Sequence, residues 1–228
     1  IEFVAQGIAR TLEPASATKF ECRRSEGDRP ELRLSWSEFS AADARNLRVE
    51  IVARLDGGDP SGRWELAVTK PRGHVLAQVH FPRLPGLSKQ PNEFLAVPAW
   101  TGELLANPRG ALTTSDGQGR RITWDYPGRL SLQCMALYQH NGPGLYLACD
   151  DAGALRKSFA VQGEGSDGIG LEISHLPENG ARDMERYALS YGVVIGVFRG
   201  NWVTAAERYR AWGTRQPWAR ESRLRQGA

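Results

Sequence analysis

The chain has 228 residues, of which 41% are hydrophobic and 24% charged, and its formal net charge at pH 7 is +3. These values are typical of a folded globular protein, and acidic residues are interleaved with basic ones, which argues against a nucleic-acid-binding stripe. No apolar run approaches the roughly 18 residues of a transmembrane helix, so we expect no membrane partner. The opening residues IEFVAQG carry neither an initiator Met nor a signal-peptide pattern, which indicates a processed or cloned segment and leaves the compartment open.

Strand patterns dominate the first half of the chain. Apolar and polar residues alternate in ELRLSWSEF (31–39) and NLRVEIVARLD (46–56), a period of two that predicts half-buried antiparallel strands. RWELAVTK (63–70) and VLAQVHF (75–81) are expected to form a hairpin around the turn at 71–73. The proline-rich stretch FPRLPGL (81–87) is expected to be a rigid crossover between sheets.

Turn residues separate further short strand patterns in the second half. We predict strands at 93–97, 121–125, 130–139, 145–149, 156–161, 169–176 and 186–198. No linker composition divides residues 1–200. The fold class expected is therefore mainly β, as one large antiparallel β-sandwich.

The hairpin predicted at 130–149 contains two of the three cysteines. If Gln139 pairs with Gly144 across the loop HNGP, Cys134 faces Cys149 directly, and a cross-strand disulfide is conceivable. Two buried thiols are the favoured interpretation, because free cysteine packs as a small hydrophobe. This register gives the hairpin an apolar core face and a mixed face that could line a groove or a domain interface. The apolar face comprises Leu130, Leu132, Cys134, Ala136 and Tyr138, and the mixed face Ser131, Gln133, Met135, Gln139, Tyr146 and Asp150.

One glycine motif and the metal-ligating residue types give little support for a cofactor. GEGSDG (163–168) fits the dinucleotide pattern G-x-G-x-x-G, but a strand pattern follows it where that motif needs a helix. We therefore predict a hairpin loop there. The four histidines are scattered and the cysteines lack zinc spacing, so neither a metal nor a cofactor is expected.

The segment RITWDYPGRLSLQ (121–133) is a candidate sugar-binding loop. It places Trp124, Asp125 and Tyr126 before a Pro-Gly turn, with Gln133 in the next predicted strand. Aromatic faces beside carboxylate and amide groups suit sugar recognition. The alternative is an aromatic plug at a strand end, which the spacing alone favours.

The stretch NWVTAAERYRAWGTRQPW (201–218) predicts the single long helix. Asn201 or Thr204 can serve as its N-cap, with Thr204 and Glu207 as a capping box. Pro217 is expected to end the helix before Trp218. The apolar stripe that helical spacing predicts consists of Ala205, Tyr209 and Trp212.

Several motifs together resemble a known arrangement over roughly residues 60–218. They are YPG (126–128), Q-x-x-A-L-Y (133–138), GLYLA-x-D (144–150), Lys157 and the closing GNW-x-x-AAE-x-YR-x-W-x-x-x-Q-x-W (200–218). Their order resembles the N-terminal galactose-mutarotase-like β-sandwich of an uncharacterised bacterial glycoside-hydrolase-like family. There, a short helix leads from the sandwich into a (β/α)₈ catalytic barrel, a layout similar to that of endo-α-N-acetylgalactosaminidases.

The resemblance implies a sandwich domain at 1–200, a linking helix at 201–218 and a polar tail at 219–228. Catalytic carboxylates would lie on the following barrel, so no catalytic residue is expected in this chain. A carbohydrate and the barrel of the same polypeptide are the partners implied. The side chains expected between the domains are Trp202, Tyr209, Trp212 and Trp218.

Two other functions stay open at this point. A stand-alone sugar-binding module would need a surface aromatic platform, for which Trp100, Trp124 and Tyr126 are candidates. A mutarotase-type epimerase would need a histidine acid and a carboxylate base in one cleft. The candidates for that pair are His80 or His175 with Glu172.

Overall fold

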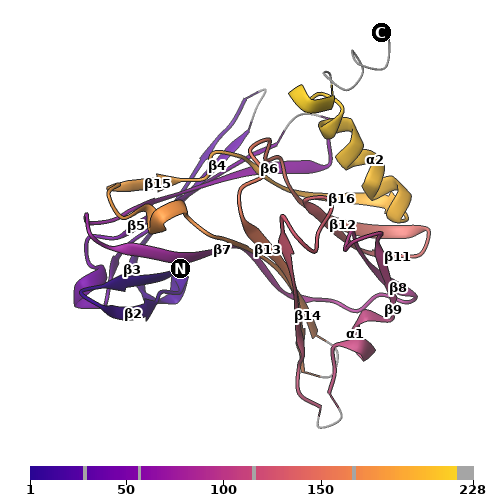
Figure 1. Ribbon diagram of the computed structural model, residues 1–228, viewed down its shortest axis with the longest axis horizontal. Coiled ribbons are helices and arrows are strands. Elements are labelled where there is room, and N and C mark those ends of the chain that lie inside the picture. Colours follow the sequence, from indigo (N-terminus) through magenta and orange to yellow (C-terminus); the bar gives the residue numbers. More distant parts are fainter. Residues whose placement is uncertain (28–29, 56–57, 115–116, 166–167, 220–228) are drawn as a thin grey trace.

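Two antiparallel β-sheets face each other in the computed structural model, which describes residues 1–27, 30–55, 58–114, 117–165 and 168–219 (Figure 1). The one long helix, α2 (Trp202–Gly213), follows the last strand. No helix in these ranges is both long and apolar enough to span a membrane. The shorter helical segments are η1 (Pro14–Ser16), η2 (Ala42–Ala44), α1 (Pro108–Ala111) and η3 (Glu178–Ala181).

The smaller sheet has six strands in the described part of the chain. In spatial order they are β10 (Arg121–Tyr126), β13 (Lys157–Glu164), β14 (Gly168–His175), β7 (Val75–Leu87), β1 (Glu2–Ala5) and β2 (Ile8–Thr11).

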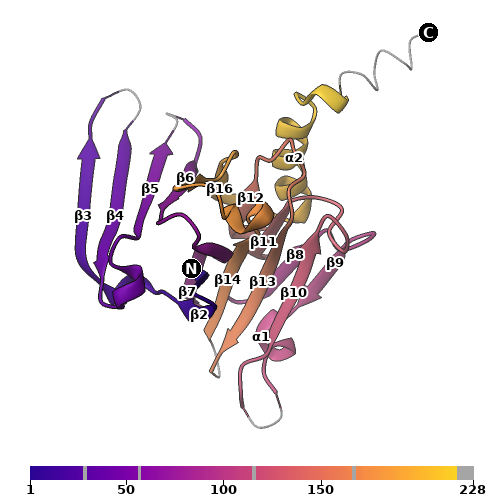
Figure 2. The same cartoon turned by 60° about the vertical axis from the view of Figure 1, so that its left-hand side comes forward.

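The larger sheet has ten described strands and is longer than the smaller one. Figure 2 shows β3, β4 and β5 at one end of the molecule, and β8 and β9 toward the other with α2 above them. In spatial order the strands are β3 (Ala17–Ser25), β4 (Glu31–Phe39), β5 (Arg48–Leu55), β6 (Ser61–Thr69), β16 (Val193–Gly200), β12 (Gly142–Cys149), β11 (Cys134–Gln139), β8 (Glu93–Val97) and β9 (Glu103–Ala106), with β15 (Arg186–Ala188) pairing with β6.

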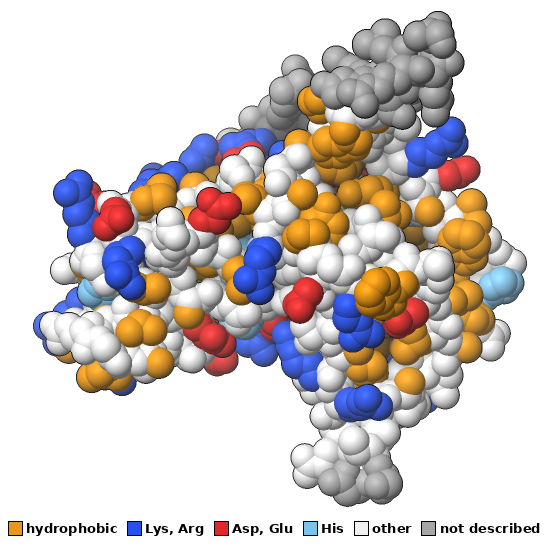
Figure 3. All heavy atoms as spheres, viewed as in Figure 1, with side chains coloured by type: hydrophobic (Ala, Val, Ile, Leu, Met, Phe, Trp, Pro, Cys, Tyr) orange, Lys and Arg blue, Asp and Glu red, His pale blue; other side chains and the backbone are white. Residues whose placement is uncertain are grey.

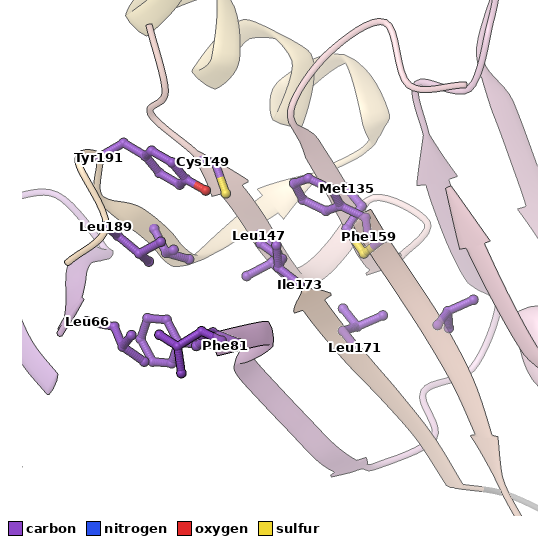
Figure 4. Close-up of a cluster of buried hydrophobic side chains, with 14 of the residues drawn as sticks. Leu66, Phe81, Met135, Leu147, Cys149, Phe159, Leu171, Ile173, Leu189 and Tyr191 are labelled. Carbon is purple, nitrogen blue, oxygen red and sulfur yellow. The ribbon is translucent and has the colours of Figure 1, made fainter. Parts of the chain in front are cut away.

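The main hydrophobic core fills the space between the sheets. Alternate residues of β13 and β14, such as Phe159 and Ile173, point into it and are fully buried. Leu66 of β6 and Leu147 of β12 enter the same core from the larger sheet (Figure 4). A period of two along each strand thus produces one shared apolar layer, as the sequence predicts. The fold class, a mainly β antiparallel sandwich with one C-terminal helix, is confirmed.

Most predicted strands are present, and two coincide with the observed limits. Residues 31–39 form β4 and residues 93–97 form β8. The pattern at 186–198 proves to be two strands in the larger sheet. The strands that the sequence did not predict are β1, β2, β3 and β9.

The hairpin predicted from 63–70 and 75–81 is wrong. β6 belongs to the larger sheet and β7 to the smaller one, so the turn that includes Gly73 carries the chain between the sheets. β6 pairs with β5 along one edge and with β15 and β16 along the other, which leaves it no free edge for β7.

The crossover predicted at 81–87 is also wrong, because FPRLPGL is the second half of β7. Leu84 and Leu87 pair with Leu171 and Ile169 of β14. β1 pairs only with the start of β7, so the proline-containing half has β14 alone as its neighbour. Proline lacks an N–H donor and is tolerated at such an edge position.

The 130–149 hairpin exists, but its register differs by one residue from the prediction. Tyr138, not Gln139, pairs with Gly144, and Cys134 therefore lies opposite Ala148. A slip of one residue moves a whole strand to the other face. Cys134 packs under the helix whereas Cys149 lies in the main core, and both are free thiols, as the favoured interpretation held. Burial raises the pKa of the Cys134 thiol to about 12.

The glycine-rich segment at 163–168 connects β13 to β14. The two strands pair antiparallel up to Glu164 opposite Gly168, which confirms the hairpin and excludes the dinucleotide interpretation. Residues 166 and 167 of the segment lie outside the described residues.

Candidate interdomain surface

Helix α2 begins at an Asn cap. The side-chain oxygen of Asn201 accepts a hydrogen bond from the Val203 amide at 2.9 Å, so Asn201 is the N-cap and Thr204 lies inside the helix. Asn is one of the residues preferred at this position because its oxygen satisfies an amide that the helix leaves unpaired. The helix ends at Gly213, before Pro217.

Two of the three residues of the predicted apolar stripe, Ala205 and Tyr209, pack on the larger sheet, whereas Trp212 is not part of the cluster that they form with it. Ala205 is buried and Tyr209 is half-buried against a second, smaller core cluster. Burial raises the pKa of the Tyr209 hydroxyl to about 12. The sheet residues of this cluster are Cys134, Ala136, Tyr138, Tyr146, Ala148 and Phe198. The hairpin is therefore apolar on both faces, and its outer face is the one that the helix covers.

A polar contact fixes the helix on the sheet as well. Arg208 donates from Nη1 to the hydroxyl of Ser61 at 2.7 Å, and the same nitrogen lies 3.6 Å from an Asp59 carboxylate oxygen. These bonds join the middle of α2 to the start of β6. The orientation of α2 on the larger sheet is thus fixed by contacts within this chain.

Exposed aromatic side chains lie at the start of α2 and just beyond its end. Trp202 is 52% exposed and Trp218, just past the helix, is 47% exposed. Trp212 lies between them and is half-buried, with its ring 5.2 Å from that of Tyr209 and 5.8 Å from that of Trp218. In the space-filling view, hydrophobic side chains gather at the upper right of the molecule, where α2 lies, and below it (Figure 3).

An apolar groove adjoins the start of the helix. It has a volume of about 420 Å³ and lies between α2 and strands β8, β9 and β11. Trp202 forms one wall, and Leu104, which is 51% exposed, forms another. We refer to the groove together with Trp202, Trp212 and Trp218 as the aromatic surface. Exposed apolar area of this kind marks interaction sites in folded proteins.

Below the helix lies a buried ionic network that the sequence only hinted at. The Lys157 ammonium donates to Asp151 Oδ2 at 2.6 Å, to Gln133 Oε1 at 2.9 Å and to the Leu155 carbonyl at 2.6 Å. The amide of Gln133 donates in turn to the Asp151 carbonyl at 2.8 Å. Every donor of the buried ammonium is used, which is what makes such a charge tolerable in a protein interior. Lys157 and Gln133 belong to the quoted motifs, but Asp151 does not.

The structure brings only two of the four candidate sugar-binding residues together, because Tyr126 and Gln133 both contact Lys157. Trp124 is 1% exposed, with its indole N–H 3.3 Å from Glu103 Oε2, and Gln133 is also 1% exposed within the Lys157 network. Trp124 is therefore the aromatic plug of the alternative interpretation, and neither residue offers a face to a ligand. Asp125 is exposed and Tyr126 is half-buried, with Lys157 5.0 Å from its ring centre.

The candidate epimerase residues form an ion-pair network on the outer face of the smaller sheet, in a hollow of about 440 Å³. Burial would raise the pKa of Glu172, but hydrogen bonds from His80 (2.9 Å) and Arg121 (2.6 Å) hold it at about 2. Arg83 lies 3.1 Å from its other oxygen. A carboxylate with so many hydrogen-bond and ionic partners is a poor general base, because its pKa lies far below neutral pH.

The other candidate histidine is enclosed. His175 is 1% exposed, and its ring nitrogens contact the Tyr191 hydroxyl and the Phe81 carbonyl, each at 2.6 Å. Burial lowers its pKa to about 4. Within the described ranges, no three His, Cys, Asp or Glu side chains come together as metal ligands.

One family model matches the end of the chain. This model, described as a domain of unknown function (DUF6259), matches residues 187–228, which include α2. No curated protein matches the sequence.

Solved structures share the fold over most of the chain. The α-N-acetylgalactosaminidase NagBb from Bifidobacterium bifidum, in its GalNAc complex, has a TM-score of 0.67 at 13% identity, covering 92% of this chain and 32% of that one. The galactosidase domain of the α-galactosidase-sucrose kinase AgaSK has a TM-score of 0.59 at 9% identity, with 87% and 30% covered. The chain thus spans about a third of each of these structures, and its fold is related to that part of the glycoside hydrolases.

Proposed function

We propose that this chain is a non-catalytic β-sandwich domain of a glycoside hydrolase, and that the aromatic surface is where the catalytic barrel of the same polypeptide packs. The carrying observation is that Trp202 and Trp218 are about half exposed at the end of the sandwich, beside an apolar groove. Contacts between domains of one chain commonly bury about 600–1,500 Å². Aromatic side chains are enriched in the buried centre of such contacts.

The similarity to glycosidase structures supports the proposal in a second way. The chain matches only about a third of each of these structures. The other two thirds of those structures are long enough to hold a catalytic domain, and we propose the same arrangement for this protein. The carbohydrate substrate of the whole protein would then be handled by that domain. The sandwich would brace the barrel through α2, whose position is already fixed by Asn201 and Arg208.

The test compares the thermal unfolding of this chain alone with that of a longer polypeptide, the native one that the proposal implies, in which the catalytic barrel follows the sandwich. Docking predicts a higher midpoint for the sandwich in the longer polypeptide, because a bound partner stabilises the native state. Trp202→Ala should lower that midpoint toward the value for the isolated chain. A loss of about 1 kcal/mol corresponds to roughly 2–4 °C in a domain of this size.

Phe20→Ala provides the matched control. Phe20 is 55% exposed, like Trp202, but lies on β3 at the opposite end of the sandwich (Figure 2). It should affect both forms equally. Equal midpoints for the isolated and the longer forms would contradict docking, as would equal effects of the two variants.

A further inference from the structure

The turn between β8 and β9 holds Trp100 in an unfavourable backbone conformation. The turn is closed by a hydrogen bond from the Gly102 amide to the Ala99 carbonyl at 2.7 Å, and Trp100 at its second position has a φ of 52°. A bulky side chain rarely adopts a positive φ, and glycine is the usual residue at such a position. Strained residues of this kind concentrate at ligand-binding sites.

The strain is not compensated by burial of the indole. Trp100 is 69% exposed, more than any other large hydrophobic side chain described. The sandwich therefore gains little packing from a residue that its backbone disfavours. A ligand that binds the exposed indole would explain why tryptophan occupies this position.

The turn is nevertheless held firmly in place. The Trp100 amide donates to the Arg129 carbonyl at 2.8 Å, and Ala99 forms a β-bridge with Leu130. The amide and the hydroxyl of Ser131 both donate to the Pro98 carbonyl at 2.9 Å. The turn is thus bound along its length to the segment after β10, and the indole projects from a fixed base.

Polar side chains that can bind hydroxyl groups lie beside this base. Glu103, at the start of β9, has one oxygen 3.3 Å from the Trp124 indole nitrogen and the other 3.9 Å from Arg129 Nη2. The side chains of Glu103 and Arg129 are 39% and 49% exposed. Asp125 is exposed on β10 of the smaller sheet, and its carbonyl accepts a hydrogen bond from the Leu130 amide.

We propose that Trp100, with Glu103 and Arg129, forms a binding platform for the pyranose ring of a neutral sugar. The ring's C–H face would stack on the indole, while the carboxylate and the guanidinium bind hydroxyl groups at its edge. Charged side chains close to the turn that carries the indole favour a sugar over a protein partner, because the centres of protein interfaces are depleted of charge. The platform adds to the docking role of α2: Glu103 also lines the groove beside the helix, whereas Trp100 and Arg129 are not among the residues that line it.

The test titrates the 228-residue chain with the methyl glycosides of the common hexoses and of their N-acetyl derivatives, at millimolar concentration, and follows binding by NMR. At least one sugar should give saturable shifts. Trp100→Gly should weaken that binding about tenfold or more, yet raise the unfolding midpoint, since glycine accepts the positive φ. Phe20→Ala, the loss of an exposed aromatic side chain elsewhere, should leave the affinity unchanged.

Three results would overturn the proposal. They are the absence of binding by the unsubstituted chain, unchanged affinity in Trp100→Gly, and a lower midpoint in that variant, which would show that the indole packs within the sandwich. If Trp100→Gly instead lowers the sandwich midpoint only in the longer polypeptide, Trp100 belongs to a protein contact. The docking of α2 is tested separately by Trp202→Ala, so either proposal can fail without the other.

Discussion

The ammonium nitrogen of Lys157 lies 2.6 Å from a carboxylate oxygen of Asp151, and the two side chains are only 0% and 3% exposed. The same carboxylate accepts hydrogen bonds from the amides of Gly153 and Leu155, which gives the loop before β13 its shape. Through Gln133 the network reaches the hairpin on which α2 rests. A buried ion pair therefore lies at the base of the aromatic surface.

Breaking this pair should be costly. Lys157→Met leaves the Asp151 carboxylate buried without its counter-charge, so we expect a loss of about 3–5 kcal/mol in the free energy of unfolding. Denaturation in urea measures it. The control is Lys19→Met, which removes an exposed partner of Glu21 and should leave the free energy of unfolding nearly unchanged, because water and salt screen such a pair. Similar losses in the two variants would show that the buried pair has no special role.

The packed ring and the exposed ring of α2 should respond differently to truncation. Tyr209→Ala removes a ring packed on the smaller core cluster and should destabilise the chain by about 2–4 kcal/mol. Trp202→Ala removes a ring that is half exposed, and the free energy of unfolding should change by about 0.5 kcal/mol or less. The same urea measurement decides. A large loss in Trp202→Ala would mean that this indole serves the sandwich and not a partner.

The Glu172 network should make stability depend on pH in the acid range. The folded pKa of Glu172 is about 2, against 4.5 for an ordinary Glu, so its contribution is present above pH 4.5 and is lost as the pH falls toward 2. That contribution is roughly 3 kcal/mol. Glu172→Gln should remove this dependence. The substitution should also remove the contribution of protonated His80 to the stability of the fold, because the pKa of His80 is raised chiefly by its hydrogen bond to Glu172.

The His80 contribution has the opposite sign. A raised folded pKa means that His80 stabilises the fold below pH 6.5 and that this stability is lost as the pH rises through the folded value. Urea unfolding between pH 2 and pH 8 separates the two windows. An unchanged pH profile in Glu172→Gln would show that the network carries no net free energy.

His175 should destabilise the fold over a different acid window. Its folded pKa of about 4 lies below the ordinary 6.5, so the unfolded chain binds its proton first, and stability falls between pH 6.5 and pH 4. The loss is roughly 3 kcal/mol. His175→Gln should be less stable at pH 7, since it disturbs the contacts with Tyr191 and Phe81, but its stability should no longer fall between pH 6.5 and pH 4.5, above the range in which Glu172 contributes. A profile as steep as that of the unsubstituted chain would contradict this account.

The sequence predicted those features that depend on interactions between residues close together in the chain. The strand at 31–39 and the helix after Asn201 follow from residue alternation and from a cap, both of which act over a few residues. The stripe of Ala205 and Tyr209 was predictable for the same reason. Pairing between distant segments was not. The turn at Gly73 has the residues of a hairpin, yet β6 already has neighbours on both edges.

The candidate site shows a similar division. Asp125 and Trp124 are adjacent in sequence, but strand alternation places one in solvent and the other in the core. An end-of-strand motif alone does not state which residue points inward. The ion pair between Lys157 and Asp151 forms only when the loop between them is folded, and hydrogen bonds to Asp151 help to hold that loop in shape. Sequence spacing alone does not predict such a pair. Trp100 was noted as an aromatic side chain, but its positive φ became visible only in the structure.

The most direct test of the central claim is hydroxyl-radical footprinting of Trp202, Trp212 and Trp218 in the isolated chain and in the longer native polypeptide. The docking account predicts that Trp202 and Trp218 oxidise readily in the isolated chain and several-fold more slowly in the longer polypeptide, with Phe20 unchanged as the internal reference. Equal oxidation rates for these tryptophans in both forms would show that nothing packs on the aromatic surface and would contradict the account.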